Sequence, residues 1–397
     1  TGTMSTDTHT TPASELLLDF ADRTGLTSPG IPRRYLWTDA FAVCTFLELF
    51  RRTGETRFQD LALQLVDQVH HVLGRHRDDD IRSGWLSGLS DENGERHPTA
   101  GGLRIGKSLP ERGPDDPVDQ RLEWEQDGQY YHYLTKWMHA LHRVSEVTGE
   151  TRYLGWAMEL AAAAHDAFTH QPGPGLQKRM YWKMSIDLTR PLVDSMGHHD
   201  PLDGLVTYCQ LQNAAEQLGG LPLNLKAEIT DMAAICHGRS WATEDPLGLG
   251  GLLFDACRVT RLMQRGALSS TDLLTTLLND ATEGFAAFAH SSPLELPAAQ
   301  RLAFRELGLS IGLHGLELMC SIVDAAPGVF PADGPAGLLP PLERHLPLAG
   351  GIETFWRNPV TQKAGTWTGH LDINQVMLAA SLVPEGFLEI GDSGGVD

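Results

Sequence analysis

The sequence has few basic residues, no long apolar run and almost no sign of β-strands. Lys and Arg together number 31 against 51 Asp and Glu, which gives the 397-residue chain a formal charge of −20. An acidic surface repels phosphate backbones, so we expect no nucleic-acid partner. A bilayer span needs roughly 20 consecutive apolar residues, and because no stretch approaches this length we expect no membrane partner.

Cysteine is also scarce. The five cysteines are odd in number, scattered, and mostly lie in apolar segments expected to be helical. This distribution is typical of reduced core thiols in a cytoplasmic protein rather than of a disulfide framework. Residues 1–12 lack the basic start and apolar run of a secretory signal, and we expect them to be disordered or tag-like. Residues 13–397 show no interdomain linker, so we expect a single catalytic domain.

Helix signals recur along the whole chain. The segment 61–72 places its apolar residues on one helix face. A nearly continuous apolar segment, 41–50, precedes it, and the turn Thr-Gly-Glu-Thr-Arg-Phe at 53–58 joins the two. Glycine in this turn can end the first helix, and Thr56 can cap the second. The same turn, ending in Tyr, recurs at 148–153, again between two segments with helical patterns. The repeat unit is therefore a helical hairpin.

Further hairpins are expected in the rest of the chain. They pair 202–216 with 223–236, 247–264 with 271–290, 302–325 with 338–348, and 373–382 with 15–23. A single hairpin of this kind cannot bury its apolar face alone, and about six of them predict an all-α, (α/α)6 toroid. The loops 77–129 and 171–200 are long and rich in Trp, Asp, His and Arg. Loops of this length usually carry function or are disordered.

The repeated turn at 53–58 and 148–153 resembles the hairpin turns of six-hairpin glycosidase-like proteins, which include unsaturated glucuronyl hydrolases and N-acylglucosamine 2-epimerases. The segment 127–141, which begins Asp-Gly-Gln-Tyr-Tyr-His, looks like the inner helix that feeds their active-site bowl. The resemblance implies the toroid fold and acid–base chemistry on sugars in that bowl. It implies no obligatory metal, so we expect no cofactor.

Several aspartates stand where inner helices are expected to begin. Aspartate is a favoured N-cap that suits the helix dipole, which explains these residues without catalysis. Glycosyl transfer, however, needs two carboxyl groups that flank the scissile bond. Glu125 and Asp127 crowd like charges, which favours a carboxyl that keeps its proton. We therefore predict Asp127 as the acid/base, with Asp39 and Asp203 as partners and Glu125 as a further catalytic candidate.

Histidines and aromatic residues supply further candidates. His132 and His139 lie two helical turns apart and can share a face. An epimerase that moves a proton beside a carbonyl would use such residues, so His132 is an alternative acid/base. Trp rings on a concave rim stack on sugar faces, and cations beside them favour an anionic substrate such as a uronate. The candidate substrate-binding residues are Arg34, Tyr35, Trp37, Trp124, Gln129, Tyr131, His139, Lys183, His198, His199, Trp241, Trp356, Trp367 and His370.

Three motifs invite other interpretations. His198, His199 and the aspartates after them resemble a zinc or manganese ligand set, but adjacent histidines point apart, so we predict a substrate-binding loop and no metal. The segment 101–108 fits the phosphate-loop pattern G-x-x-x-x-G-K-S. No strand precedes it and a proline follows it, so we interpret it as a chance match. Cys236-His237-Gly238 resembles a motif of zinc-binding lanthionine cyclases, but their second cysteine motif is missing.

The sequence thus predicts a carbohydrate-active enzyme, with hydrolysis of a small saccharide, anionic by preference, as the leading hypothesis. A sugar 2-epimerase is the nearest alternative. A non-sugar dehydratase or cyclase of isoprenoid type is another, because one toroid hosts many chemistries. The identity of the substrate and the oligomeric state stay open.

Overall fold

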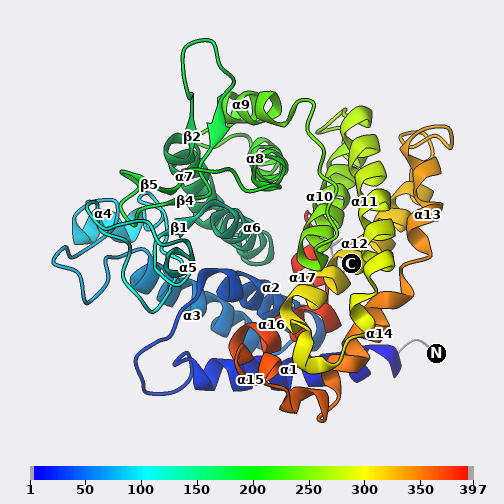
Figure 1. Ribbon diagram of the computed structural model, residues 1–397, viewed down its shortest axis with the longest axis horizontal. Helices are drawn as coiled ribbons and strands as arrows, with labels where there is room; N and C mark the ends of the chain where they lie inside the picture. Colours follow the sequence, from blue (N-terminus) through cyan, green and yellow to red (C-terminus); the bar gives the residue numbers. More distant parts are fainter. Residues whose placement is uncertain (1–3, 392–397) are drawn as a thin grey trace. The chain divides into compact units, whose positions relative to one another are not determined.

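The computed structural model describes residues 4–391 and is dominated by α-helices (Figure 1). These residues form two compact units. Unit 1 comprises 4–20, 51–54 and 238–390, and unit 2 comprises 21–50, 55–237 and 391. The expected tail, 1–12, lies partly outside the described residues, and helix α1 begins at Met4. The single domain over 13–397 stays a prediction.

Unit 2 is built mainly from long helices. They are α2 (Leu36–Thr53, whose last turn belongs to unit 1), α3 (Thr56–Leu73), α6 (Tyr131–Thr148), α7 (Thr151–Phe168), α8 (Asp200–Gln217) and α9 (Lys226–Cys236). Two short helices, α4 (Asp91–Arg96) and α5 (Gln120–Glu123), interrupt the long loop between α3 and α6. Helix α6 packs against both α7 and α8, and α8 packs against α9 (Figure 1).

Five short strands join the loops of unit 2. They are β1 (Gln129–Tyr130), β2 (Thr169–His170), β3 (Arg179–Met180), β4 (Lys183–Met184) and β5 (Pro191–Val193). The first sheet has the antiparallel order β1-β4-β5, with Gln129 opposite Met184 and Tyr130 opposite Lys183. The strands β2 and β3 form a second antiparallel pair. The first sheet therefore fastens the loop before α8 to the residues that enter α6.

Unit 1 consists of helices and short 3-10 turns. Its helices are α1 (Met4–Arg23, whose last residues belong to unit 2), α10 (Pro246–Gln264), α11 (Thr271–Ser291), α12 (Ala303–Ala325), α13 (Pro340–Glu343), α14 (Pro347–Arg357), α15 (Gly365–Thr368), α16 (Leu371–Leu382) and α17 (Glu385–Leu388). The 3-10 turns are η1 (Pro293–Glu295), η2 (Ala298–Gln300), η3 (Pro335–Leu338) and η4 (Thr361–Lys363). Helices α10 and α12 form the main packing contact, and α12 also packs on α14 and α16.

The hairpin turns follow the predicted pattern with one change. Gly149 adopts a left-handed conformation, φ 72°, directly after α6, and Gly54 has φ 71°. Such a conformation is easily reached only by glycine, so each turn ends its helix sharply. The predicted cap, Thr56, is instead the first residue of α3, and Glu55 stands before it without a side-chain cap hydrogen bond. Glu150 holds the same position before α7.

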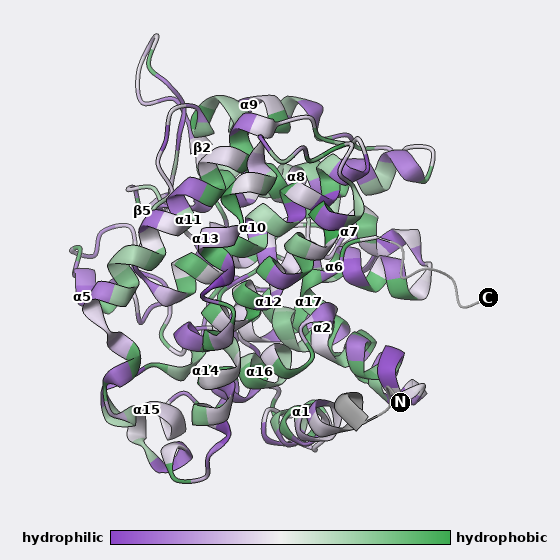
Figure 2. Ribbon diagram, turned by 90° about the vertical axis from the view of Figure 1, so that its right-hand side faces the viewer, coloured by the Kyte–Doolittle hydropathy of each residue, from purple (hydrophilic) through white to green (hydrophobic). Residues whose placement is uncertain are grey.

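Apolar side chains fill the core of each unit, and helices such as α9 and α11 carry both hydrophilic and hydrophobic residues (Figure 2). By length and composition α12 is the one helix of the described residues apolar enough to cross a membrane, which the sequence-based count of apolar runs did not anticipate. Two thirds of its most apolar window, 67%, is buried. The packing of α12 on three helices of unit 1 explains its apolar composition as that of a core helix.

The helix predicted at 338–348 differs from the structure. That segment contains the end of η3, the short helix α13 and only the start of α14. Pro340 and Pro347 each stand at the first turn of a helix, where proline is tolerated. Since proline cannot continue a preceding helix, the apolar pattern is divided between two helices.

Candidate functional site

The first turns of α6 and α8, which pack against each other in unit 2, bring several ionisable side chains together. Helix α8 begins with Asp200-Pro201, and proline at this position is preorganised for a helix start. Asp200 and Asp203 both lie in its first turn, where the helix dipole favours negative charge. His132, Thr135 and Lys136 come from the start of α6. We call these five side chains the acid cluster: His132, Thr135, Lys136, Asp200 and Asp203.

Within the acid cluster, Asp203 is held as a carboxylate. The ammonium group of Lys136 lies 2.9 Å from its Oδ2, and the hydroxyl of Thr135 donates a hydrogen bond to the same oxygen. Asp203 is 5% exposed. A charge-assisted hydrogen bond of this kind stabilises the ionised form of a buried carboxyl. Asp203 therefore carries negative charge into the first turn of α8.

The surroundings of Asp200 instead disfavour the charged form of its carboxyl. Burial and the nearby charge of Asp203 raise its pKa to about 7, although Lys136 acts in the opposite direction. Its Oδ2 is buried without a hydrogen-bond partner among the described residues. A Cβ at Gly197 would lie 2.4 Å from that oxygen, so only glycine leaves room for the carboxyl. Asp200 thus holds a proton near neutral pH and has one oxygen that is not used by the fold.

His132 faces Asp200 from α6. The distance from its Nδ1 to Asp200 Oδ1 is 3.9 Å. Burial, assisted by the charge of Lys136, lowers the pKa of His132 to about 3, so the imidazole is neutral at physiological pH. Its side chain is still 31% exposed. A neutral imidazole and a protonated carboxyl therefore lie side by side, next to a fixed carboxylate.

Aromatic rings line the acid cluster on one side. The hydroxyl oxygens of Tyr35 and Tyr133 lie 2.8 Å apart, and the ring of Tyr133 contacts those of Trp37, Tyr130 and His132 at centroid distances of 5.5, 5.0 and 4.8 Å. The indole Nε1 of Trp37 is buried without a hydrogen-bond partner within residues 4–391. We call Tyr35, Trp37, Tyr130 and Tyr133 the aromatic cluster. Trp37 and Tyr130 are buried, so the ring surface beside the ionisable groups comes from the half-buried Tyr35 and Tyr133.

Cations and a further indole adjoin the aromatic cluster. The ammonium group of Lys107 lies 5.4 Å from the centre of the Tyr35 ring, and that of Lys136 lies 5.5 Å from the Trp37 ring. Trp124 is 40% exposed, and its ring contacts that of Tyr130 at 6.0 Å. A ligand on this surface would therefore meet both aromatic rings and positive charge.

The predicted acid/base Asp127 lies elsewhere in unit 2 and is completely buried. Its Oδ2 accepts from Arg104 at 2.7 Å and from Arg77 at 3.0 Å. Its Oδ1 accepts from the backbone N–H groups of Gly106, Lys107 and Gly128. With both oxygens engaged in this way, Asp127 anchors the segment 101–108, which forms an irregular loop and has none of the strand–helix context of a phosphate loop. This geometry favours a structural role.

The other two predicted carboxylates also lie outside the acid cluster. Asp39 is 1% exposed, accepts from the backbone N–H of Tyr35 and lies 3.6 Å from the guanidinium of Arg34. Arg34 is itself buried and donates to Thr24. Glu125 is exposed at the surface. Asp39 and Arg34 therefore fix the start of α2 and with it the position of Tyr35 and Trp37.

Several predicted binding residues hold loops or helices together. Lys183 is fully buried and donates to the backbone oxygens of Glu123 and Gln126 at 2.6 and 2.8 Å. Gln129 donates to the backbone oxygens of Gly101 and Ile186. The hydroxyl of Tyr131 donates to that of Tyr208, and His139 contacts Gln210. These contacts give the four predicted binding residues a structural role within unit 2.

Further candidates lie in unit 1. Trp356 is fully buried and stacks on Trp367 at 5.9 Å, and Trp241 is 1% exposed. These rings belong to the core of unit 1. His370 is exposed and contacts the ring of Phe304 at 5.6 Å.

The loop before α8 carries the adjacent histidines. The rings of His198 and His199 lie 4.7 Å apart, and His199 occupies the N-cap position of α8, directly before Asp200. Within residues 4–391 no group of three or more His, Cys, Asp or Glu side chains is arranged to hold a metal ion.

Sequence reasoning missed Asp200 as an acid, and it missed Tyr133 and the two α6 residues that hold Asp203. The available signal was the pair of aspartates three residues apart at the start of α8, a spacing that places both on one helix face. The sequence alone presents Asp200 only as a possible metal ligand beside His198 and His199. Its protonation depends on Asp203, His132 and Lys136, and no local pattern indicates that combination.

No family model and no curated protein matches the sequence. Solved structures do match. A family 76 glycoside hydrolase from a bovine Bacteroides thetaiotaomicron strain is 11% identical, with a TM-score of 0.53 over 95% of this chain and 77% of that chain. Cellobiose 2-epimerase from Spirochaeta thermophila is 11% identical, with a TM-score of 0.52 over 94% and 97%. A GH76 α-mannanase from Bacteroides thetaiotaomicron is 9% identical, with a TM-score of 0.50 over 95% and 96%.

These likenesses confirm the predicted fold class. The chain is all-α and has the fold of the (α/α)6 toroid enzymes, and the structures it matches are members of the six-hairpin glycosidase-like superfamily. At 9–11% identity the likeness concerns the fold. Which reaction the chain performs has to be argued from its own side chains.

Proposed function

We propose that the chain is a carbohydrate-active enzyme that hydrolyses a glycosidic bond, with Asp200 as the general acid. The observation that carries the proposal is the acid cluster, in which one carboxyl keeps its proton and its neighbour does not. The fold supports it, because solved structures that share this fold include a glycoside hydrolase and a sugar epimerase. The aromatic cluster supports it as well, because tyrosine and tryptophan rings stack on the apolar faces of sugars.

Hydrolysis of a glycosidic bond needs an acid that protonates the leaving oxygen and a carboxylate that activates the attacking water. The raised pKa of Asp200, about 7, keeps a proton available at neutral pH, and within the described residues no hydrogen bond holds its buried Oδ2. Asp203 is the carboxylate, and it accepts the proton of the attacking water. One water is consumed, the leaving oxygen gains the proton of Asp200, and the two carboxyls return to their starting states by proton exchange with solvent. Pairs of carboxyls whose environments separate their pKa values are typical of such acid and base roles.

The surroundings of the acid cluster indicate the kind of saccharide. Tyr35 and Tyr133 provide ring surface, and the exposed Trp124 extends it. Lys107 stands above the Tyr35 ring and can pair with a carboxylate on the sugar. We therefore propose a small saccharide, with an anionic one such as a uronate bound better than a neutral one.

One observation favours a 2-epimerase as the second candidate. The neutral imidazole of His132 lies 3.9 Å from the carboxyl of Asp200, so a base and an acid are neighbours. Such a pair can remove a proton beside a carbonyl and return one. The pKa of His132, about 3, makes it a weak base, which is why hydrolysis is the first candidate.

Mass spectrometry after incubation in D₂O with a panel of mono- and oligosaccharides, including unsaturated uronides, tests both candidates. Hydrolysis gives cleaved products, whereas epimerisation gives a one-dalton gain without cleavage. We expect cleavage by the wild-type protein and its loss in Asp200→Asn. Glu125→Gln, which changes an exposed carboxylate outside the acid cluster, is the matched control and should retain activity. Cleavage that survives in Asp200→Asn would overturn the role of Asp200 as the general acid. Neither cleavage nor a mass gain with any saccharide of the panel would overturn the proposed sugar chemistry.

A further inference from the structure

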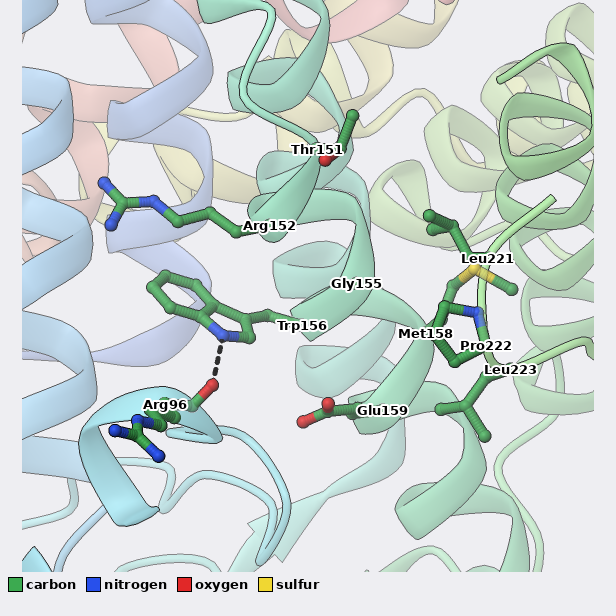
Figure 3. Close-up of a pocket in the computed structure, with 10 residues that line it drawn as sticks. All are labelled: Arg96, Thr151, Arg152, Gly155, Trp156, Met158, Glu159, Leu221, Pro222 and Leu223. Carbon is green, nitrogen blue, oxygen red and sulfur yellow. Dashed lines mark hydrogen bonds between the residues drawn. The ribbon is translucent and has the colours of Figure 1, made fainter. Parts of the chain in front are cut away.

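A pocket of about 270 Å³ opens on the face of α7 in unit 2, and none of its residues belongs to the acid cluster or the aromatic cluster (Figure 3). Helix α7 forms one wall, the end of α4 with Arg96 forms a second, and the segment 221–223 before α9 forms the third. Ligand sites for drug-sized molecules start at about 300 Å³, so this volume suits a ligand of a single ring.

The pocket has an apolar side and a charged side. Met158 and the segment Leu221-Pro222-Leu223 line the apolar side, while the indole of Trp156 extends from α7 in the opposite direction, beyond Gly155 (Figure 3). Arg96, Arg152 and Glu159 contribute the charged groups. A ligand that fills the pocket must therefore have both an apolar face and polar substituents.

The indole of Trp156 is held in place before any ligand arrives. Its Nε1 donates to the backbone oxygen of Arg96 at 2.8 Å, which is the dashed line in Figure 3. Thr99 donates to the backbone oxygen of Trp156 at 2.7 Å, and the ring of His70 meets the indole edge-on at 5.3 Å. A fixed aromatic ring is a preorganised stacking surface, which lowers the entropic cost of binding.

Glu159 supplies an acceptor that the fold leaves unused. Its Oε1 lies 2.8 Å from Nδ1 of His97, whereas its Oε2 is buried without a hydrogen-bond partner among residues 4–391. An unsatisfied buried acceptor is costly, so a ligand O–H or N–H at this oxygen gains more than it would in water. Glu159 therefore selects a ligand with a hydrogen-bond donor.

The two arginines supply donors. Arg96 donates to Glu92 at 2.7 Å, and Arg152 contacts Glu150 at 2.9 Å and the hydroxyl of Tyr153 at 3.1 Å. A guanidinium has five N–H donors, so these contacts leave donors on both side chains for a ligand. The two positive charges repel a cationic ligand, and the carboxylate of Glu159 repels a phosphate or another anion. The charge pattern thus favours a neutral ligand.

Gly155 keeps the pocket open. It lies inside helix α7, where glycine is less favourable than alanine. A Cβ placed on it meets nothing within 4 Å, so close packing does not require glycine here. Because Gly155 lines the pocket, a larger side chain at this position would project into the open space. The helix therefore accepts a poor helix former at the position where a side chain would fill the pocket.

From these observations we infer that the pocket is a non-catalytic binding site for a neutral pyranose ring. A pyranose offers an apolar face to Trp156 and Pro222, hydroxyl donors to Glu159, and hydroxyl acceptors to the two arginines. A purely apolar ring would leave Glu159 unsatisfied, and a charged ring would meet a like charge on one side. The inference does not depend on the proposed hydrolysis, because binding at this pocket requires no turnover.

Saturation-transfer NMR with the methyl glycosides of glucose, mannose and galactose tests the site in the full-length protein. We expect at least one of them to bind the wild type, and Gly155→Leu to abolish that signal. Glu159→Leu should weaken binding about ten-fold or more, because it removes a hydrogen bond to a charged group. Gly155→Ala is the matched control, since it adds only a methyl group and should retain binding.

The folded state of each variant is checked by its melting temperature. Neither Gly155 variant should lose thermal stability, because both replace a poor helix former where nothing is contacted. Loss of binding in Gly155→Leu with unchanged cleavage separates this site from the acid cluster. Undiminished binding in Gly155→Leu, or no signal with all three glycosides, would overturn the inference.

Discussion

Replacement of Asp200 by asparagine should make the protein more stable while it removes the proposed acid. Asp200 is 4% exposed and lies beside the charge of Asp203, and its pKa is raised from 3.8 to about 7. The folded protein therefore holds the proton more tightly than the unfolded chain. The stability that this proton confers is fully present below pH 3.8 and is lost as the pH rises through about 7.

The size of the effect follows from the two pKa values. The interval between 3.8 and about 7 corresponds to roughly 4 kcal/mol, at 1.36 kcal/mol for each pKa unit. Asparagine has the same shape as a protonated aspartate and does not titrate. Its advantage over aspartate should therefore grow from about 1 kcal/mol near pH 4.5 to about 4 kcal/mol above pH 7. For a chain of this length, 4 kcal/mol corresponds to a rise in Tm of about 5 °C.

Thermal and urea unfolding of the wild type and Asp200→Asn, at about pH 4.5 and pH 8, measure this difference directly. Glu125→Gln serves as the control, because its exposed side chain should give no pH-dependent difference. The reasoning would be refuted if the asparagine variant had the same advantage at both pH values, or if it were less stable at the higher one. Activity should fall at least about a hundred-fold in the same variant, the usual contribution of a general acid.

Three further substitutions test other parts of the structure. Asp127→Asn should cost about 3 kcal/mol in urea unfolding, because the buried guanidinium of Arg104 loses its charged partner and that of Arg77 keeps only Asp79; an unchanged midpoint would contradict the anchoring role. Lys136→Met removes a charge that lowers the pKa of Asp200, so the alkaline limb of kcat/KM against pH should move to higher pH; a limb that stays in place would contradict this coupling. Burial opposes the charge on His314, but its hydrogen bond to Glu353 raises its pKa. Glu353→Gln should therefore lower Tm at neutral pH, with a difference that shrinks as the pH rises through the raised pKa, and a difference that grows would argue against the ion pair.

Local sequence patterns sufficed for most of the fold. The helices predicted at 61–72, 247–264 and 271–290 correspond to α3, α10 and α11, because apolar periodicity and glycine turns act over a few residues. The prediction of one helix at 338–348 was wrong, because the prolines in this segment divide its apolar pattern between two helices. The number of hairpins and the repeated turn predicted the toroid class, which the solved structures confirm.

The candidate site was less accessible from sequence, because a carboxylate's role depends on partners that are distant in the chain. Asp127 was chosen for its acidic neighbours, yet its partners are Arg77, 50 residues before it, and Arg104, 23 residues before it. Asp203 and His132 were both among the predicted catalytic residues, and the structure brings them into one cluster. Whether they act in catalysis stays a prediction.

The charged partners of five aspartates at or near helix starts separate those held as carboxylates from the candidate acid. Four of them contact cations: Asp39 with Arg34, Asp127 with Arg77 and Arg104, Asp203 with Lys136, and Asp245 with Arg305. A cation beside a carboxylate favours its charged form. Asp200 instead faces the carboxylate of Asp203 and the neutral ring of His132, so its charged form is the unfavourable one. An enzyme that needs a carboxylic acid at neutral pH needs this arrangement, whereas a helix cap does not. The stability that Asp200 costs the fold is therefore the strongest reason to look for the chemistry there.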